Sequence, residues 1–293
     1  MPKYLLVNAD DFGMCHSANV ATFELFEKGY LKSATIMIPC PTAKEAVDFS
    51  VANPEYGIGV HLTMTAEWEN YRWKPLTMRK SLMDKEGFMW HEAEEVQLHA
   101  KLKDLEAEIR AQIDKAHEWG MRPDHIDSHM TSLYGFNTGR FSVLGMTIRV
   151  VGEYGYAYRL YTKTDPRVSP RDIPYPIWAA TTKISSRLSK KHGVIMPDYL
   201  LFPDWNKDLR ENGYEHYRDE ILKIWTNIPE NEVTETFVHP SIESDEIKGI
   251  TGLWHCRVWE YELLKDPYVH QYLKDHDVQL VSYGDLIRMK TSY

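Results

Sequence analysis

Four short segments of the sequence end in residues that can bind a metal ion or transfer a proton. They are residues 8–11 (NADD), the run that ends near His61, residues 125–129 (HIDSH) and the run that ends at His239. An aspartate together with two imidazoles suits a catalytic divalent ion, because three protein ligands leave positions open for water and substrate. These segments predict a metal-dependent catalytic site if the fold brings them together.

The two adjacent aspartates suggest a division of labour. A divalent ion acidifies a bound water and polarises a carbonyl, and a nearby carboxylate that is not a ligand can take the proton of that water. Successive side chains diverge along an extended segment, so one aspartate can bind the ion while the other acts as the base. The residues alone leave open whether Asp11 binds the metal and Asp10 is the base, or the reverse.

The third segment places His125, Asp127 and His129 on one face of a strand, because side chains alternate along it. Residues four apart on a straight strand are about 13 Å apart, so His125 and His129 cannot both bind one ion unless the chain bends after Asp127. One histidine is expected to be a ligand and the other to contact substrate or a ligand. Asp127 is suited to orient an imidazole.

Positioning these residues requires a fold that gathers strand ends. Short apolar runs predict buried strands at residues 4–8, 34–38, 58–62, 125–128, 156–160, 199–202, 236–238 and 278–282. Helical patterns lie at residues 19–28, 92–119, 178–190, 214–227 and 259–265. The alternation predicts a mainly parallel sheet with helices outside, and about eight strands fit an irregular (β/α) barrel in a single domain over residues 1–293. An open doubly wound sheet is the alternative, but no Gly-rich turn follows the first strand. In a barrel the carboxyl ends of the strands converge on one face, where active sites lie.

Composition excludes several classes of protein. The 293 residues include 34 Lys and Arg against 43 Asp and Glu, a net charge of −9, which disfavours nucleic acid as a partner. The three widely spaced cysteines support neither a disulfide framework nor a cysteine zinc site. No apolar run approaches the roughly 18 residues of a membrane span, and the N-terminus lacks the pattern of a signal peptide. A cytoplasmic protein with no membrane partner is expected.

The ordered set of motifs resembles the YdjC-like carbohydrate deacetylases, a family that includes the chitooligosaccharide deacetylases. The resemblance rests on residues 8–13 (NADDFG), 59–63 (GVHLT), 125–129 (HIDSH) and 238–240 (VHP). It extends to the tail pattern Arg257-x-x-Glu260 and so covers most of the chain.

This resemblance implies an irregular TIM-like barrel that hydrolyses the N-acetyl group of a small acetylated amino sugar or short oligosaccharide. It implies one divalent metal ion, magnesium or zinc, and favours a homodimer. Carried over by position, the metal ligands are Asp11, His61 and His125. Asp10 is then the general base and His239 the general acid for the leaving amine. A substrate-contacting role is expected for His129 and, by a looser match, for Arg159, which is also suited to orient a carboxylate.

The sequence departs from the family pattern around the expected substrate. Residues 130–135 (MTSLYG) replace a further histidine motif, and Ser241 stands where many members have glycine after His-Pro. An aromatic loop after His61 carries Trp68 and Trp73, which either stack on a sugar ring or pack on top of the barrel.

Two other functions remain open at this stage. The same site could hydrolyse another amide or an ester, and a non-catalytic carbohydrate-binding barrel is a further alternative. A glycosidase is disfavoured, because two adjacent aspartates do not flank a bond from opposite sides.

Overall fold

The structure is a computed structural model that describes residues 1–136, 138–168, 175–202 and 206–292. Its centre is one sheet with the strand order β5-β4-β3-β2-β1-β7-β6, and β8 also pairs with β1. The strands are β1 (Lys3–Phe12), β2 (Ser33–Ile36), β3 (Gly57–Leu62), β4 (His125–Ser128), β5 (Ala157–Tyr158), β6 (Tyr199–Leu200), β7 (Val233–Val238) and β8 (Val278–Leu280). Every pairing is parallel, and each of the eight predicted strands is present.

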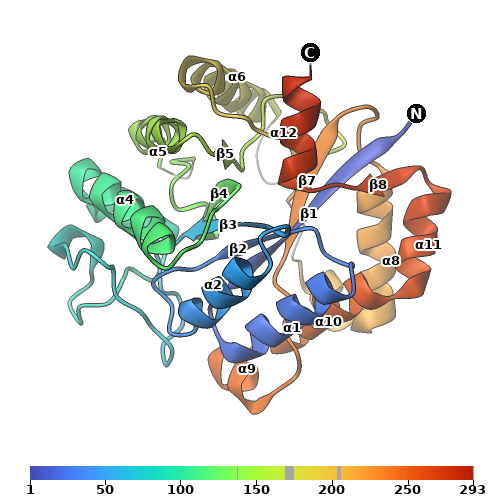
Figure 1. Cartoon of the computed structure of the whole chain (residues 1–293), viewed down its shortest axis with the longest axis horizontal. Coiled ribbons are helices and arrows are strands. Elements are labelled where there is room, and N and C mark those ends of the chain that lie inside the picture. The colour runs from blue at the N-terminus through green and yellow to red at the C-terminus, as the bar shows by residue number, and fades with distance from the viewer. Residues whose placement is uncertain (137, 169–174, 203–205, 293) are drawn as a thin grey trace.

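The sheet curls into an incomplete barrel with helices on its outside (Figure 1). In the described residues, β5 and β6 at the two edges do not pair as strands. Backbone hydrogen bonds cross the gap instead, from Tyr158 to Ile195 (2.9 Å) and from Thr162 and Lys163 to Asp198 (3.2 and 2.8 Å). The prediction of an irregular (β/α) barrel is therefore confirmed.

The surrounding helices are α1 (His16–Glu27), α2 (Ala43–Ala52), α3 (Ala93–His99), α4 (Leu102–Glu118), α5 (Phe141–Tyr154), α6 (Tyr175–His192), α7 (Lys207–Glu211), α8 (Gly213–Thr226), α9 (Asp245–Ile250), α10 (Trp254–Lys265), α11 (Pro267–Asp275) and α12 (Tyr283–Thr291), with short 3₁₀ turns η1 (Lys80–Leu82) and η2 (His129–Thr131). None of the helices in the described part of the chain is long and apolar enough to cross a membrane.

The single helix predicted over residues 92–119 is two helices. The backbone of Ala100 between α3 and α4 is extended (φ −71°, ψ 135°). Arg140 donates hydrogen bonds from Nη1 to the carbonyls of Gln97 (2.6 Å) and Ala100 (2.7 Å), which the break leaves without helical partners. Leu98 is 68% exposed, so it does not share a buried face with the apolar residues of α4.

Alternation along β1 separates an apolar face from a polar one. Leu5, Val7 and Ala9 belong to the main hydrophobic core under the helices. Leu6, Asn8 and Asp10 alternate with them, and Asn8 and Asp10 therefore face the interior of the barrel. The packing of the helices thus fixes which side chains reach the interior.

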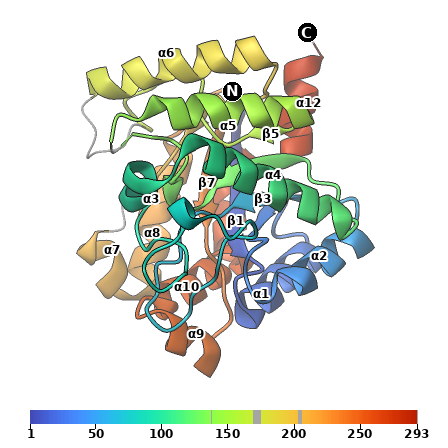
Figure 2. The ribbon, with the colours of Figure 1, turned by 90° about the vertical axis from the view of Figure 1, so that its left-hand side faces the viewer.

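A long connection, residues 63–92, joins β3 to α3 and forms irregular coils beside α3 (Figure 2). It is held by internal hydrogen bonds, such as Arg72 Nη2 to the carbonyl of Met89 (2.6 Å) and Trp73 Nε1 to the carbonyl of Thr65 (2.8 Å). This connection brings Glu67 to the carboxyl ends of the strands, where the candidate site lies.

Candidate active site

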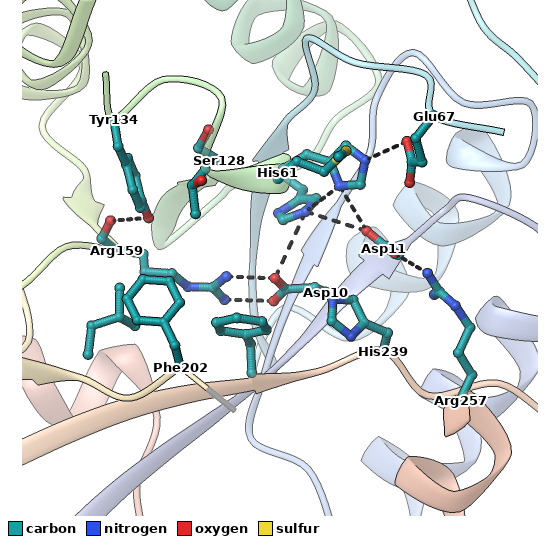
Figure 3. Close-up of a pocket in the computed structure, with 15 residues that line it drawn as sticks. Asp10, Asp11, His61, Glu67, Ser128, Tyr134, Arg159, Phe202, His239 and Arg257 are labelled. Atoms are coloured by element: carbon teal, nitrogen blue, oxygen red, sulfur yellow. Dashed lines mark hydrogen bonds and ion pairs between the residues drawn. The ribbon is translucent and has the colours of Figure 1, made fainter. Parts of the chain in front are cut away.

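A pocket of about 160 Å³ lies at the carboxyl ends of β1, β3, β4 and β7 (Figure 3). Most of the predicted site residues line it: Asp10, Asp11, His61, His129, Arg159 and His239. Residues that the sequence places more than 200 positions apart thus meet, as a barrel requires.

A bulge in β1 directs both aspartates into this pocket. The pairing register between β1 and β2 shifts between Ala9 and Phe12, and Asp11 has a left-handed backbone (φ 59°). In a regular strand the side chains of Asp10 and Asp11 would point to opposite faces, as the sequence predicted. The bulge corrects that expectation, because both carboxylates line the pocket.

One oxygen of Asp11 and one nitrogen from each of two imidazoles converge in the pocket. Asp11 Oδ1 lies 3.2 Å from His129 Nδ1 and 3.5 Å from His61 Nε2, and the two imidazole nitrogens are 3.3 Å apart. Asp11 Oδ1 is buried, and no group in the described chain makes a hydrogen bond of good geometry to it. A buried carboxylate oxygen in this state points to a cation as its partner.

Carboxylates on the outer nitrogens fix the direction of both imidazoles. The strand register pairs His61 with Asp127, and His61 Nδ1 lies 2.6 Å from Asp127 Oδ1. The outer nitrogen of the other imidazole, His129 Nε2, lies 3.1 Å from Glu67 Oε2. When the protons stay on these outer nitrogens, the inner nitrogens can bind a metal ion beside Asp11, as in many metal sites.

The spacing of the three inner atoms fits one ion. Ligand atoms about 2.1 Å from a tetrahedral zinc lie roughly 3.4 Å from one another. The observed separations of 3.2, 3.3 and 3.5 Å among Asp11, His61 and His129 agree with that value. These residues form a cluster able to hold a metal.

The electrostatics of the cluster favour positive charge. Burial opposes a charge on His61, but the carboxylates of Asp127 and Asp10 outweigh it and raise the pKa of His61 to about 9. Burial likewise opposes a charge on His129, but Glu67 and Asp11 raise its pKa to about 10.

Arg257, from α10, holds the second oxygen of Asp11. Its Nη2 lies 2.7 Å from Asp11 Oδ2. Burial alone would raise the pKa of Asp11, but Arg257 and His129 together hold that pKa well below its usual range. Asp11 is therefore a carboxylate, the form that binds a metal.

Asp10, His61 and Asp127 also lie close enough together to hold an ion. Arg159 occupies the carboxylates of this second group, since its guanidinium lies 2.6 Å from Asp10 Oδ2 and 2.9 Å from Asp127 Oδ2. The cluster around Asp11 is therefore the better candidate for a metal.

Asp10 is held by a bidentate pair with Arg159 (2.6 and 2.7 Å) and by Asn8 Nδ2 (2.8 Å). Arg159 also donates from Nε to Glu235 (2.7 Å). Of the roles expected for Arg159, the structure shows that of orienting carboxylates, while the guanidinium still lines the pocket.

His239 follows β7 and faces the pocket from the opposite side to Glu67 (Figure 3). Glu260 accepts a hydrogen bond from the backbone N–H of His239 (2.8 Å), and its Oε2 lies 3.7 Å from His239 Nδ1. Burial opposes a charge on His239, but Glu260 raises its pKa above the ordinary value.

His125 does not lie with Asp11 and His61, which corrects the predicted ligand set. It is the first residue of β4, and Nδ1 lies 2.6 Å from Asp124 Oδ1 while the ring stacks on Tyr283. His129 follows the last residue of the same strand, so the length of β4 separates the two histidines. His129 therefore stands in the place expected for His125.

Trp68 and Trp73 are not among the described residues that line the pocket. Trp73 is 3% exposed, and Trp68 packs against it with ring centroids 5.6 Å apart. The guanidinium of Arg257 lies over Trp68 at 5.7 Å. Of the two interpretations of this loop, packing on top of the barrel fits the structure.

Sequence reasoning did not single out Glu67 or Arg257 for a role in the site. Glu67 directly precedes Trp68 in the aromatic loop, and no spacing rule links it to His129 across 62 positions. Arg257 belonged to the tail pattern Arg257-x-x-Glu260, whose helical spacing was a usable signal for two residues on one face.

The fold and the site together place the chain among parallel α/β barrel proteins with a candidate metal centre at the strand ends. The chain belongs to the YdjC-like protein family, which it matches over residues 4–275.

Relatives bear names that refer to sugars. A carbohydrate deacetylase of Geobacillus stearothermophilus is 26% identical over 289 residues, which cover 99% of this chain and 100% of that protein. A chitooligosaccharide deacetylase of Yersinia enterocolitica is 36% identical over 292 residues, covering 97% and 100%.

A crystal structure of a proposed cellobiose-phosphate cleavage protein from Enterococcus faecalis matches the fold with a TM-score of 0.76. It is 26% identical, and the match covers 98% of this chain and 99% of that one.

Proposed function

We propose that this protein is a metal-dependent hydrolase that removes an N-acetyl group from an acetylated amino sugar or short oligosaccharide. The observation that carries the proposal is the convergence of Asp11 Oδ1, His61 Nε2 and His129 Nδ1, at 3.2–3.5 Å from one another, in a pocket that also holds Asp10 and His239. The family relatives named as carbohydrate and chitooligosaccharide deacetylases support the choice of substrate class.

Asp11, His61 and His129 would hold one divalent ion. Two imidazoles favour zinc over magnesium, which prefers an all-oxygen shell. When bound, such an ion supplies an acidified water and polarises the acetyl carbonyl.

Asp10 is proposed to take the proton of the attacking water. Arg159 and Asn8 hold its carboxylate, but Oδ2 accepts only the bond from Arg159 Nη1 among the described residues and keeps a second lone pair. That atom lies 4.0 Å from His61 Nε2, so it is beside the proposed metal centre.

His239 is proposed to give a proton to the departing amine. Its raised pKa keeps the imidazole protonated nearer neutral pH, as an acid requires. His239 and Asp10 line the same pocket, from the ends of β7 and β1 (Figure 3).

The pocket is small enough that only one end of an oligosaccharide substrate would fit inside it. Its volume of about 160 Å³ is below that of pockets that enclose a drug-sized ligand. Phe202 and Phe237 form part of its wall and offer an apolar surface to a sugar ring. The acetamido group would occupy the pocket, with the rest of an oligosaccharide outside.

The test is acetate release from N-acetylglucosamine, its 6-phosphate and diacetylchitobiose, with and without a chelator. The proposal expects release from at least one of them, abolished by the chelator and restored by zinc or magnesium. Release that a chelator does not affect would contradict the metal. Bound metal without release from any of the three would move the assignment to another amide or an ester.

A further inference from the structure

We propose that His125 and Tyr283 are positioning residues for Asp10, which they reach by two separate hydrogen-bond paths through the interior of the barrel. The inference rests on the proposed role of Asp10 as the base. In the described part of the chain neither residue lines the pocket, so both must act through other side chains.

The first path runs from β4 to β1. His125 Nε2 lies 3.1 Å from Asn8 Oδ1, and Asn8 Nδ2 donates to Asp10 Oδ1 (2.8 Å). Asp10 fixes the orientation of the Asn8 side-chain amide. A carboxylate only accepts hydrogen bonds, so the amide nitrogen of Asn8 must face Asp10. The amide oxygen of Asn8 must then face His125, which donates from Nε2.

The second path begins on α12. Tyr283 donates its hydroxyl to Glu235 Oε2 (2.6 Å), and Glu235 Oε1 accepts from Arg159 Nε (2.7 Å). The two Nη atoms of Arg159 then bind Asp10 at 2.6 and 2.7 Å. Tyr283 and Glu235 are fully buried and Arg159 is 3% exposed, so water does not compete for these bonds.

The two paths meet at their far ends. The rings of His125 and Tyr283 stack with centroids 3.8 Å apart and planes 10° apart. Gly59 leaves the space for this arrangement, since a Cβ there would lie 2.4 Å from the carbonyl oxygen of His125 and 2.8 Å from its ring. The remaining ring nitrogen of His125, Nδ1, lies 2.6 Å from Asp124 Oδ1.

The geometry holds Asp10 in one orientation. Asn8 and Arg159 together give its two oxygens three hydrogen bonds from two directions. Ser33 also donates to Asn8 Oδ1 (2.6 Å) and Arg159 also pairs with Asp127 (2.9 Å), so loss of either far end loosens the hold on the carboxylate without releasing it. A small misplacement of a catalytic group lowers turnover more than substrate binding, since binding involves many other contacts.

The first variant is Tyr283→Phe, which keeps the ring against His125 and removes only the hydroxyl. We expect kcat for the best of the three acetylated sugars to fall roughly tenfold, with KM and bound metal unchanged. The matched control is Tyr161→Phe, which removes another buried hydroxyl, bonded to Thr181 at 2.6 Å, outside both paths. Its kcat is expected to stay within about twofold of the wild type.

The second pair of variants separates the two nitrogens of His125. The amide of a glutamine reaches the position of Nε2, whereas that of an asparagine reaches only that of Nδ1. His125→Gln is therefore expected to keep more of the wild-type kcat than His125→Asn. Both variants should retain the metal, because His125 is outside the proposed ligand set.

The outcomes separate this inference from the proposed function. Wild-type protein that releases no acetate would overturn the proposed function and, with it, the base that these residues position. Active wild type with Tyr283→Phe as active as Tyr161→Phe would overturn the positioning role alone. Loss of bound metal in His125→Gln would also overturn it, since His125 would then be a ligand.

Discussion

Each imidazole of the candidate metal centre has a carboxylate on its outer nitrogen. Asp127 holds His61 at 2.6 Å, and Glu67 holds His129 at 3.1 Å. The two carboxylates differ in setting, because Asp127 lies within β4 with a fully buried side chain, whereas the side chain of Glu67 is 18% exposed on an irregular connection. Single-residue changes can therefore test each imidazole separately.

Replacing Glu67 tests how far His129 depends on its carboxylate. Glu67→Ala is expected to weaken zinc binding about 10- to 100-fold, because the imidazole loses the group that fixes its proton on Nε2. Glu67→Gln should lose less, since its amide oxygen can still accept that proton. Competition with a chromophoric chelator measures both affinities, and equal affinity in wild type and Glu67→Ala would refute the role.

Replacing Asp10 separates the base from the metal ligands. Asp10→Asn is expected to lower kcat by at least about 100-fold while the protein retains its metal. His61→Ala, by contrast, should lose the metal as well as activity. Near-normal turnover of Asp10→Asn would show that another group takes the proton.

The pH profile tests His239. Glu260 raises the pKa of His239, so the protonated acid persists to higher pH and activity declines only as pH rises through that raised value. In Glu260→Gln the charge is gone but an oxygen remains for the His239 backbone N–H. The alkaline limb of the kcat/KM profile is then expected to move to lower pH with the metal content unchanged. An unmoved limb would mean that His239 is not the acid.

At the scale of elements, the strands could be predicted but the details of their ends could not. Apolar β-branched runs such as that in β3 identify buried strands, and the order of the four motifs places polar residues at their carboxyl ends. The choice between His125 and His129 depends on where β4 ends, which the alternating HIDSH pattern does not state. The bulge at Asp11 depends on the pairing between β1 and β2, which is a tertiary property.

Gly59 in β3 provides a test at this scale. Gly59→Ala is expected to destabilise the fold by about 1–3 kcal/mol, because the added Cβ would press on the His125 backbone and ring. Gly145→Ala is the matched control, since this glycine lies in α5 with nothing within 4 Å of an added Cβ, and helix propensity predicts a gain of up to about 1 kcal/mol. Urea denaturation measures both, and equal free energies of unfolding for the two variants would contradict this account of Gly59.

At the scale of the whole molecule, strand–helix alternation sufficed to predict the irregular barrel, which the sheet topology and the similar fold of the Enterococcus faecalis structure confirm. What alternation could not supply is the set of contacts between distant segments. Arg257 of α10 reaches Asp11 of β1, and Tyr283 of α12 reaches Glu235 of β7. Both contacts depend on how α10 and α12 pack against the sheet, which local sequence patterns do not predict.

The proposed metal centre combines distant parts of the chain, and its least predictable ligand is the histidine that joins Asp11 and His61. The most direct measurement is zinc binding by metal-free wild type, His129→Ala and His125→Gln, by calorimetric titration with circular dichroism to confirm folding. The account predicts one zinc ion per chain in the wild type and in His125→Gln, and an affinity at least about 100-fold weaker in His129→Ala. Loss of zinc from His125→Gln together with normal binding by His129→Ala would contradict it.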